Sequence, residues 1–236
     1  MQLMRGALGG KDDTSMLIDI PATLSRTRDA IASLGGDVAI FEIGPPATVQ
    51  DVVEIERRFE RDIPQALRRV LLEQSAGLRF SWTVGRRAPV PKIFRNDLAG
   101  SIELTLSELP TDMLNWFGWR DAFEYPEEHG LPTDLTVQDY EELFPLVAAV
   151  NGDQIVVADP TNNPSDAVMY LNHEAGNFNF VILADTLEDF LNTWIPLGCP
   201  GPEWWELAPF IDTKTLKLSL NTRLSRAWLR TLTSAL

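Results

Sequence analysis

The spacing of apolar residues changes along the chain from a helical to a strand period, and this change constrains the fold more than any other feature. Apart from a short apolar run over 38–43, apolar side chains between residues 22 and 76 recur every three or four positions, as on the buried face of a helix. From Leu78 to Val84 they occupy every second position, as in a half-buried strand. Further strand patterns and then further helical patterns follow with no obvious linker between them. This order indicates an α+β fold in a single domain.

Caps, turns and periodicity give the expected bounds of the elements. Thr48, with Asp51 three residues later, forms a variant of the capping box at a helix start, and Pro64 opens the next helix. Asn151-Gly152 between two apolar runs is typical of a tight hairpin, because both residues tolerate positive φ. Helices are expected over 22–34, after 48, from 64, over 113–125, over 137–144, after a cap at Asp185 and over 224–235. Strands are expected over 38–43, 78–84, 101–106, 146–150, 154–158, 167–171 and 178–183.

The composition is that of an ordinary globular protein that needs no covalent or metal support. With 236 residues, 44% of them hydrophobic, the chain is long enough to bury a sizeable core. Cys199 is the only cysteine, so an internal disulfide is excluded. No apolar run reaches the roughly 18 residues of a membrane span, and the first residues lack a secretory signal pattern. We therefore expect a soluble, cytoplasmic protein without a membrane partner.

Charge is unevenly distributed along the chain. The formal net charge is −14, and residues 103–142 hold eleven acidic residues against the single base Arg120. Residues 213–236 hold five bases and no acid. Because nucleic acid is bound largely through Lys and Arg at its phosphates, the overall charge argues against a nucleic-acid partner and favours a basic protein partner. The simpler alternative is that the acidity only keeps the chain in solution.

Several short motifs follow one another in a recognisable order. A capped helix bearing Glu56 leads through Ile63-Pro64 into an apolar helix that ends at Ser75-Ala76-Gly77. Farther along, three apolar strands lead into a helix containing the pair Phe190-Leu191. In this order of motifs, from about residue 46 to residue 195, the chain resembles the SUKH superfamily, the Smi/Knr-type proteins. It departs from the family pattern at Ile63, where Leu is common, and at Ser75-Ala76, where Asn is usual.

The resemblance implies both a fold and a class of function. The implied fold has helices packed on a mixed, mostly antiparallel sheet, with a family-like core over about 46–195. An acidic helical insertion at about 103–142 and a C-terminal helical extension over 202–236 would complete the domain. Bacterial members of the family are typically immunity proteins that bind and neutralise toxins, and fungal members regulate cell-wall synthesis through protein contacts. No catalytic residues are known for the family, so the resemblance implies none here.

The residue types that usually carry catalysis are few and poorly placed. The two histidines, His129 and His173, have no second ligand or base partner at a useful spacing, and both are interpreted as loop residues. Cys199 has no recognisable base near it. The acids at 153, 159 and 166, with Asn162-Asn163, fit no EF-hand loop and are interpreted as turn residues. We therefore expect no enzyme activity, no cofactor and no metal site.

Aromatic and acidic residues are interspersed after residue 115 in a pattern that suits a protein-binding surface. Trp and Tyr dominate binding hot spots, and surrounding carboxylates speed the approach of a basic partner. In the alternative interpretation, the aromatic side chains are core and the acids are their solvated edge. Trp204-Trp205 are expected to divide in this way, with one of them in the core. The predicted partner-binding residues are Trp116, Trp119, Asp121, Phe123, Glu124, Tyr125, Glu127 and Glu128.

The resemblance and the charge together predict an immunity-type protein that sequesters a cytoplasmic toxin domain by covering a basic active-site cleft. The expected toxin is a nuclease or another toxin directed at nucleic acid. Two alternatives stay open, a regulatory scaffold like the fungal members and an unrecognised hydrolase. The sequence leaves open whether the basic C-terminal helix packs on the core of this chain or on a partner.

Overall fold

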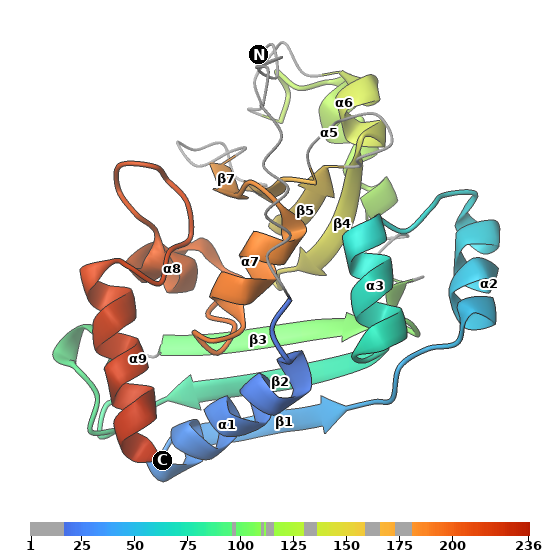
Figure 1. Cartoon of the computed structure of the whole chain (residues 1–236). Helices are drawn as coiled ribbons and strands as arrows, with labels where there is room; N and C mark the ends of the chain where they lie inside the picture. Colours follow the sequence, from blue (N-terminus) through green and yellow to red (C-terminus); the bar gives the residue numbers. More distant parts are fainter. Residues whose placement is uncertain are drawn as a thin grey trace, which may run out of the picture.

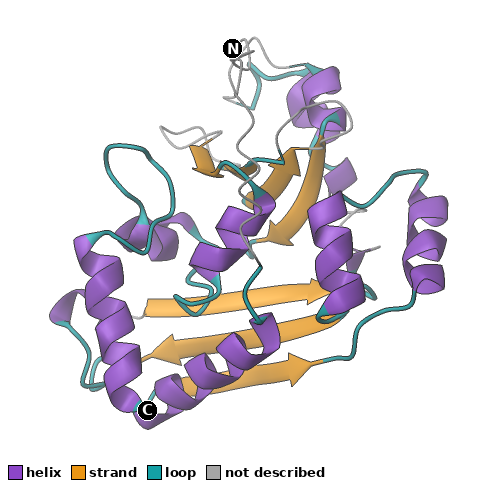
Figure 2. Cartoon of the chain, viewed as in Figure 1, coloured by secondary structure: helices purple, strands orange, loops and turns teal. Residues whose placement is uncertain are grey.

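The computed structural model describes residues 17–95, 98–109, 111, 116–129, 136–158, 166–172 and 181–236. Within them, two antiparallel sheets combine with helices in the predicted α+β fold (Figure 1, Figure 2). Sheet A has the strand order β1-β2-β3, and sheet B has the order β4-β5-β6-β7. The strands are β1 (Asp37–Ile43), β2 (Gly77–Val84), β3 (Leu98–Thr105), β4 (Leu143–Ala148), β5 (Gln154–Ala158), β6 (Val168–Leu171) and β7 (Val181–Ala184).

The longer helices gather on one side of sheet A. Figure 1 shows α1, α3, α7 and α9 in front of this sheet, with α5 and α6 at the far end of sheet B and α2 at the margin. None of the helices in the described ranges is long and apolar enough to cross a membrane. The helices are α1 (Ile20–Ser33), α2 (Val49–Phe59), α3 (Gln65–Glu73), α5 (Arg120–Glu124), α6 (Val137–Glu141), α7 (Leu187–Trp194), α8 (Trp204–Leu207) and α9 (Arg223–Ala235), with 3-10 turns η1 (Lys92–Phe94) and η2 (Ala208–Phe210).

Local hydrogen bonds decide where the helices begin. Thr48 and Asp51 form the predicted capping box at the start of α2, each side chain accepting a hydrogen bond from the backbone N–H of the other. The prediction that Asp185 caps α7 is wrong by one residue. The Thr186 hydroxyl accepts the hydrogen bond from the backbone N–H of Asp189, at 3.0 Å. Both threonines have the extended backbone of an N-cap residue.

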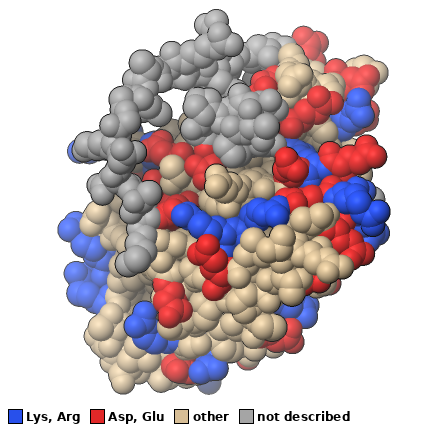
Figure 3. Space-filling model, turned by 45° about the vertical axis from the view of Figure 1, so that its right-hand side comes forward, with Lys and Arg blue, Asp and Glu red and all other residues tan. Residues whose placement is uncertain are grey.

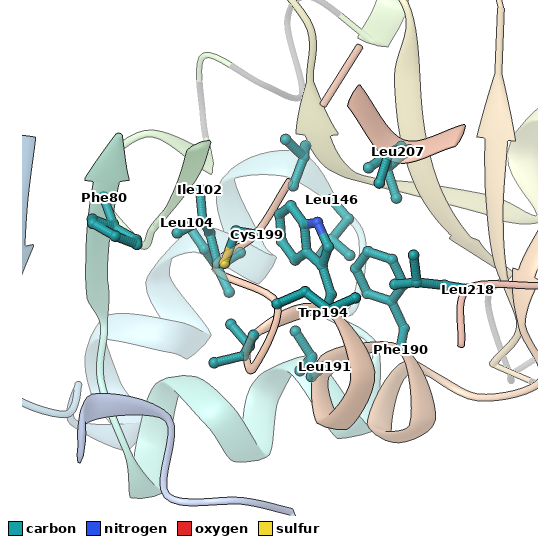
Figure 4. Packing of buried hydrophobic residues seen from close by; sticks show 14 of the residues in the cluster. Phe80, Ile102, Leu104, Leu146, Phe190, Leu191, Trp194, Cys199, Leu207 and Leu218 are labelled. Carbon is teal, nitrogen blue, oxygen red and sulfur yellow. The ribbon is translucent and has the colours of Figure 1, made fainter. Parts of the chain in front are cut away.

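The main core lies between sheet A, one face of sheet B and the covering helices. The alternation predicted over residues 78–84 is confirmed, since every second side chain of β2 from Leu78 to Val84 is buried in this core. Trp194 is fully buried, and Figure 4 shows its indole between Cys199 on one side and Phe190 on the other. Its Nε1 donates a hydrogen bond to the backbone O of Pro200 at 2.8 Å, so the buried indole N–H has a hydrogen-bond acceptor.

The basic C-terminal helix α9 packs on the main core. Trp228 is fully buried and stacks on Trp82, with ring centroids 5.6 Å apart. Its Nε1 donates a hydrogen bond to the backbone O of Leu197 at 2.8 Å. The three arginines of α9 lie away from this apolar stripe. The helix therefore uses its apolar face for the core of its own chain and directs its charges toward solvent.

Sheet B is buried on both faces, which explains the unbroken apolar runs of its strands. In β4, Phe144 contacts the main core, and its neighbour Leu143 contacts a second core on the opposite face. Because Leu143 begins this strand, the helix predicted over 137–144 ends at Glu141. Phe123 of α5 and Tyr140 of α6 belong to this second core, and Figure 1 shows both helices at the end of sheet B. The second core comprises Trp116, Phe123, Tyr140, Leu143, Val156, Ala158, Met169 and Leu171.

Candidate protein-binding surface

Two of the aromatic residues predicted to bind a partner lie in the second core. Trp116 and Phe123 are 0% and 1% exposed. The Trp116 ring stacks on Tyr140 with centroids 4.8 Å apart, and the Tyr140 hydroxyl donates a hydrogen bond to the backbone O of Trp116 at 3.2 Å. For these two side chains the structure corresponds to the alternative interpretation of core aromatics. Trp116 and Phe123 can therefore contribute to a binding surface only indirectly, by supporting the exposed residues around them from the core.

The other predicted residues lie around the outside of this aromatic cluster. Tyr125 is 48% exposed, and Phe117, which the sequence did not single out, is 50% exposed. Trp119 is half-buried and stacks on Trp116 with centroids 6.1 Å apart. We call the outer part the α5 surface, which comprises Phe117, Asp121, Glu124, Tyr125, Glu127 and Glu128.

The α5 surface is strongly negative at its centre. The Tyr125 hydroxyl donates a hydrogen bond to Oε1 of Glu124 at 3.3 Å. The negative charge of Glu124 is the main cause of a raised pKa for Tyr125, and Asp121 and Glu128 act in the same direction. A negative potential has this effect because it opposes the loss of the phenolic proton. Figure 3 shows many Asp and Glu side chains at the upper right, with some Lys and Arg side chains among them.

The remaining acids of residues 103–142 are distributed over other parts of the fold. Glu103 lies in β3 and pairs with Arg79, with 2.8 Å between Oε1 and Nε. Asp139 caps α6, since its carboxylate accepts a hydrogen bond from the backbone N–H of Thr136 at 2.8 Å. Asp112 and residues 130–135 lie outside the described residues. The segment predicted as an insertion thus begins inside a strand of sheet A, and only part of its charge belongs to the α5 surface.

Arg61 anchors this region to the N-terminal half of the chain. Its guanidinium donates hydrogen bonds to the backbone O of Glu141, at 2.9 Å, and to the backbone O of Leu143. It also lies over the ring of Phe144, 5.5 Å from the centroid. A cation in this place satisfies carbonyl groups that a helix end leaves unpaired. The turn between α2 and α3 is therefore tied directly to the junction of α6 and β4.

The residues considered for catalysis occupy unreactive places or fall outside the described residues. His129 is exposed in the turn that follows α5, and His173 lies outside the described residues. Cys199 is fully buried, and this burial raises the pKa of its thiol well above the ordinary value, which disfavours the reactive thiolate. Across the described part of the chain, no group of three or more His, Cys, Asp or Glu side chains could hold a metal ion.

The acidic turn residues are engaged in structural contacts where the structure describes them. Asp153 is buried and accepts hydrogen bonds from the hydroxyl of Tyr170 and, at 2.9 Å, from the side chain of Asn151. This network holds the predicted Asn151-Gly152 hairpin between β4 and β5, in which Gly152 has φ of 98°. Burial raises the pKa of Asp166. Residues 159–165, which include the other acid and both asparagines, lie outside the described residues.

A pocket that the sequence pattern did not reveal lies on the side of sheet A that faces away from the main core. It has a volume of about 180 Å³ and is lined by Asp37 of β1 on one side and by Glu203 and Glu206, beyond β3, on the other. The two glutamates are three residues apart at the start of α8, so they share a face of that turn and lie close together. Burial, reinforced by Glu203, raises the pKa of Glu206 to about 8. In the sequence, only the three-residue spacing of Glu203 and Glu206 could have indicated that two carboxyl groups lie together here.

Gly100 allows the segment that carries these glutamates to approach β3. The backbone N–H of Gly201 donates to the O of Ala99 at 3.3 Å, and the N–H of Ser101 donates to the O of Gly201 at 3.0 Å. A Cβ at Gly100 would lie 2.6 Å from the backbone O of Gly198 and equally close to that of Cys199. A side chain does not fit in this space, so the close approach requires glycine.

Comparison with known proteins adds no family or relative to these observations. No protein-family model matches the chain, and no curated protein matches it. The resemblance to the SUKH superfamily stays a prediction that rests on the motifs quoted above.

Proposed function

We propose that this chain is an immunity-type protein that binds a toxin domain and neutralises it by covering a basic cleft. The α5 surface would make the contact. The observation that carries the proposal is the exposed Tyr125 among Glu124, Asp121 and Glu128, beside the packed aromatic residues of the second core. The resemblance to the SUKH superfamily supports the same class of function.

The structure of the α5 surface suits recognition of a basic protein. Aromatic side chains that are already ordered lose little entropy when a partner covers them, so they contribute efficiently to binding. The stacked rings of Trp116, Trp119 and Tyr140 provide that order here. Carboxylates at the rim mainly raise the rate of association and select against acidic partners. Inhibition would then be steric and electrostatic and would need no catalytic group.

The test is co-expression with a toxin encoded beside this gene, followed by kinetics on the purified pair. Replacement of Glu124, Glu127 and Glu128 by Lys is expected to lower the association rate constant by about tenfold or more at low salt. The difference should shrink as salt is added, because salt screens exposed charges. Stopped-flow or surface-binding measurements would give the rate constants.

A matched control carries the same change of charge at a distance from the α5 surface. Asp29, Glu54 and Glu73 lie on α1, α2 and α3, and their replacement by Lys should leave the association rate close to that of the original chain. Absence of protection and of a complex at low salt would show the proposal to be wrong. A complex that forms without neutralising a toxin would instead favour the regulatory scaffold.

A further inference from the structure

The face of sheet A that turns away from the main core carries mostly polar and small side chains, with Ile40 of β1 exposed beside Ser81. In β2 these are Arg79, Ser81 and Thr83, which alternate with the buried residues of the strand. Figure 1 shows α1, α3, α7 and α9 all on the opposite face. The segment around α8 forms one wall of the pocket on this side, through Gly201, Glu203 and Glu206. We call this side the outer face.

The outer face has an excess of negative charge. Arg79 lies between two acids, with Nε 2.8 Å from Glu103 and Nη1 3.3 Å from Glu42. These neighbours, Glu103 first, raise the pKa of Arg79, and their charges neutralise it. Asp37, Glu203 and Glu206 stand at the other end of the face, and none of the described residues that line the pocket is basic. The pocket therefore lacks a cation comparable to Arg79, which lies toward the opposite end of β2.

Size and chemistry restrict what the pocket accommodates. The hydroxyl-bearing residues Ser81, Thr83 and Ser101 line it beside the three acids. Its volume of about 180 Å³ is below the roughly 300–1,000 Å³ of sites for drug-sized ligands. Anions, including phosphates, are repelled by the carboxylates. A cationic group on a slender apolar stem matches the charge, the acceptors and the space, and lysine and arginine side chains have that form.

We propose that the outer face of sheet A is a second interaction surface, which receives a basic segment of a partner protein and places one of its lysine or arginine side chains in this pocket. The outer face belongs to sheet A, whereas the α5 surface lies over sheet B. The inference therefore does not depend on the proposed immunity function, and either surface can exist without the other.

Protonation of Glu206 provides a measurement that distinguishes binding in the pocket from binding elsewhere. With its pKa at about 8, Glu206 holds a proton at neutral pH. The other charged residues that line the pocket are Glu203, directly before α8, and Asp37 on β1, while β2 and β3 contribute uncharged residues. A cation in the pocket favours the ionised carboxylate and so expels the proton. Binding is expected to release a proton at neutral pH and to strengthen as pH rises toward about 9.

An oligolysine peptide serves as the probe, with affinity and proton release measured by calorimetry in two buffers of different ionisation enthalpy. One variant combines Asp37→Asn, Glu203→Gln and Glu206→Gln; its matched control combines Glu124→Gln, Glu127→Gln and Glu128→Gln. Both remove three carboxylates. The pocket variant should bind about tenfold more weakly and without proton release, since charged hydrogen bonds are lost. The control should retain the proton release.

A second variant keeps every charge and fills the pocket. Ala99 lines the pocket, and Ala99→Leu should weaken peptide binding while thermal unfolding shows that the chain stays folded. The inference is overturned if the original chain binds no peptide or releases no proton on binding. It is equally overturned if both pocket variants bind as the original chain does. Because the probe is a peptide, such a result leaves the toxin experiment to be judged separately.

Discussion

Glu206 couples the stability of the chain to pH. Its folded pKa of about 8 lies above the ordinary 4.5, so between these values the folded chain holds a proton that the unfolded chain releases. The free energy of unfolding therefore falls as pH rises through this window. Gln mimics the protonated side chain, so Glu206→Gln should have little effect below the window and should gain stability relative to the original chain up to about pH 8. Urea denaturation at several pH values measures this difference.

A control for the loss of one charge is Glu124→Gln on the α5 surface, which lies outside the pocket. A stability difference for Glu206→Gln that stays constant across the window would contradict the raised pKa of Glu206.

Substitutions at Gly100 and Gly85 together test whether residues 198–201 must lie close to β3. Gly100 is at the contact, and Gly85 is the control. Gly100→Ala brings a Cβ against rigid backbone oxygens and against Nε1 of Trp82, 2.7 Å away, and should destabilise the fold by about 1–3 kcal/mol. A Cβ at Gly85 would meet no described atom within 4 Å, so Gly85→Ala should be neutral or slightly stabilising. Chemical denaturation compares them. Equal effects of the two substitutions on the free energy of unfolding would mean that residues 198–201 move to make room for the added methyl group at little cost.

At the scale of elements, local signals were predicted well and long-range ones were not. The alternation in β2 and the capping box of α2 were predicted because each depends on residues close together in sequence. The cap at Asp185 was misplaced because Thr186 beside it offers an equally good acceptor, and only the backbone conformation distinguishes them. The packing of α9 was left open, since its apolar stripe fits any apolar surface until Trp82 is known to face it.

The division of the strands into two sheets could not be predicted from the sequence either. An apolar run such as that of β5 indicates burial on both faces but does not identify what covers each face. Val156 contacts the second core and its neighbour Val157 contacts the main core. The cover for Val156 includes Trp116 and Phe123, which lie far back in the sequence and which periodicity alone could not assign to the core.

At the scale of the whole molecule, the sequence predicts the total charge but not where the charged residues lie on the surface. The excess of acids over residues 103–142 suggested one acidic surface, yet Glu103 faces Arg79 on sheet A while Glu124 borders Tyr125 beyond sheet B. Conversely, Glu203 and Asp37 are far apart in the sequence and meet at one pocket. Surfaces assembled from distant segments require the topology, which explains why the α5 surface was found in part and the outer face was missed.

Since sheet B contributes to both cores, the described parts of the molecule are expected to unfold as one cooperative unit. Phe123→Leu loosens only the second core and should lower the free energy of unfolding by about 1 kcal/mol. The transition midpoints from far-ultraviolet circular dichroism and from tryptophan fluorescence should shift together. Phe117→Leu, an exposed change of the same kind, should leave both in place. Two separated transitions, or a shift in one probe alone, would mean that the second core unfolds independently, and the α5 surface would then lack the rigid base on which its proposed role depends.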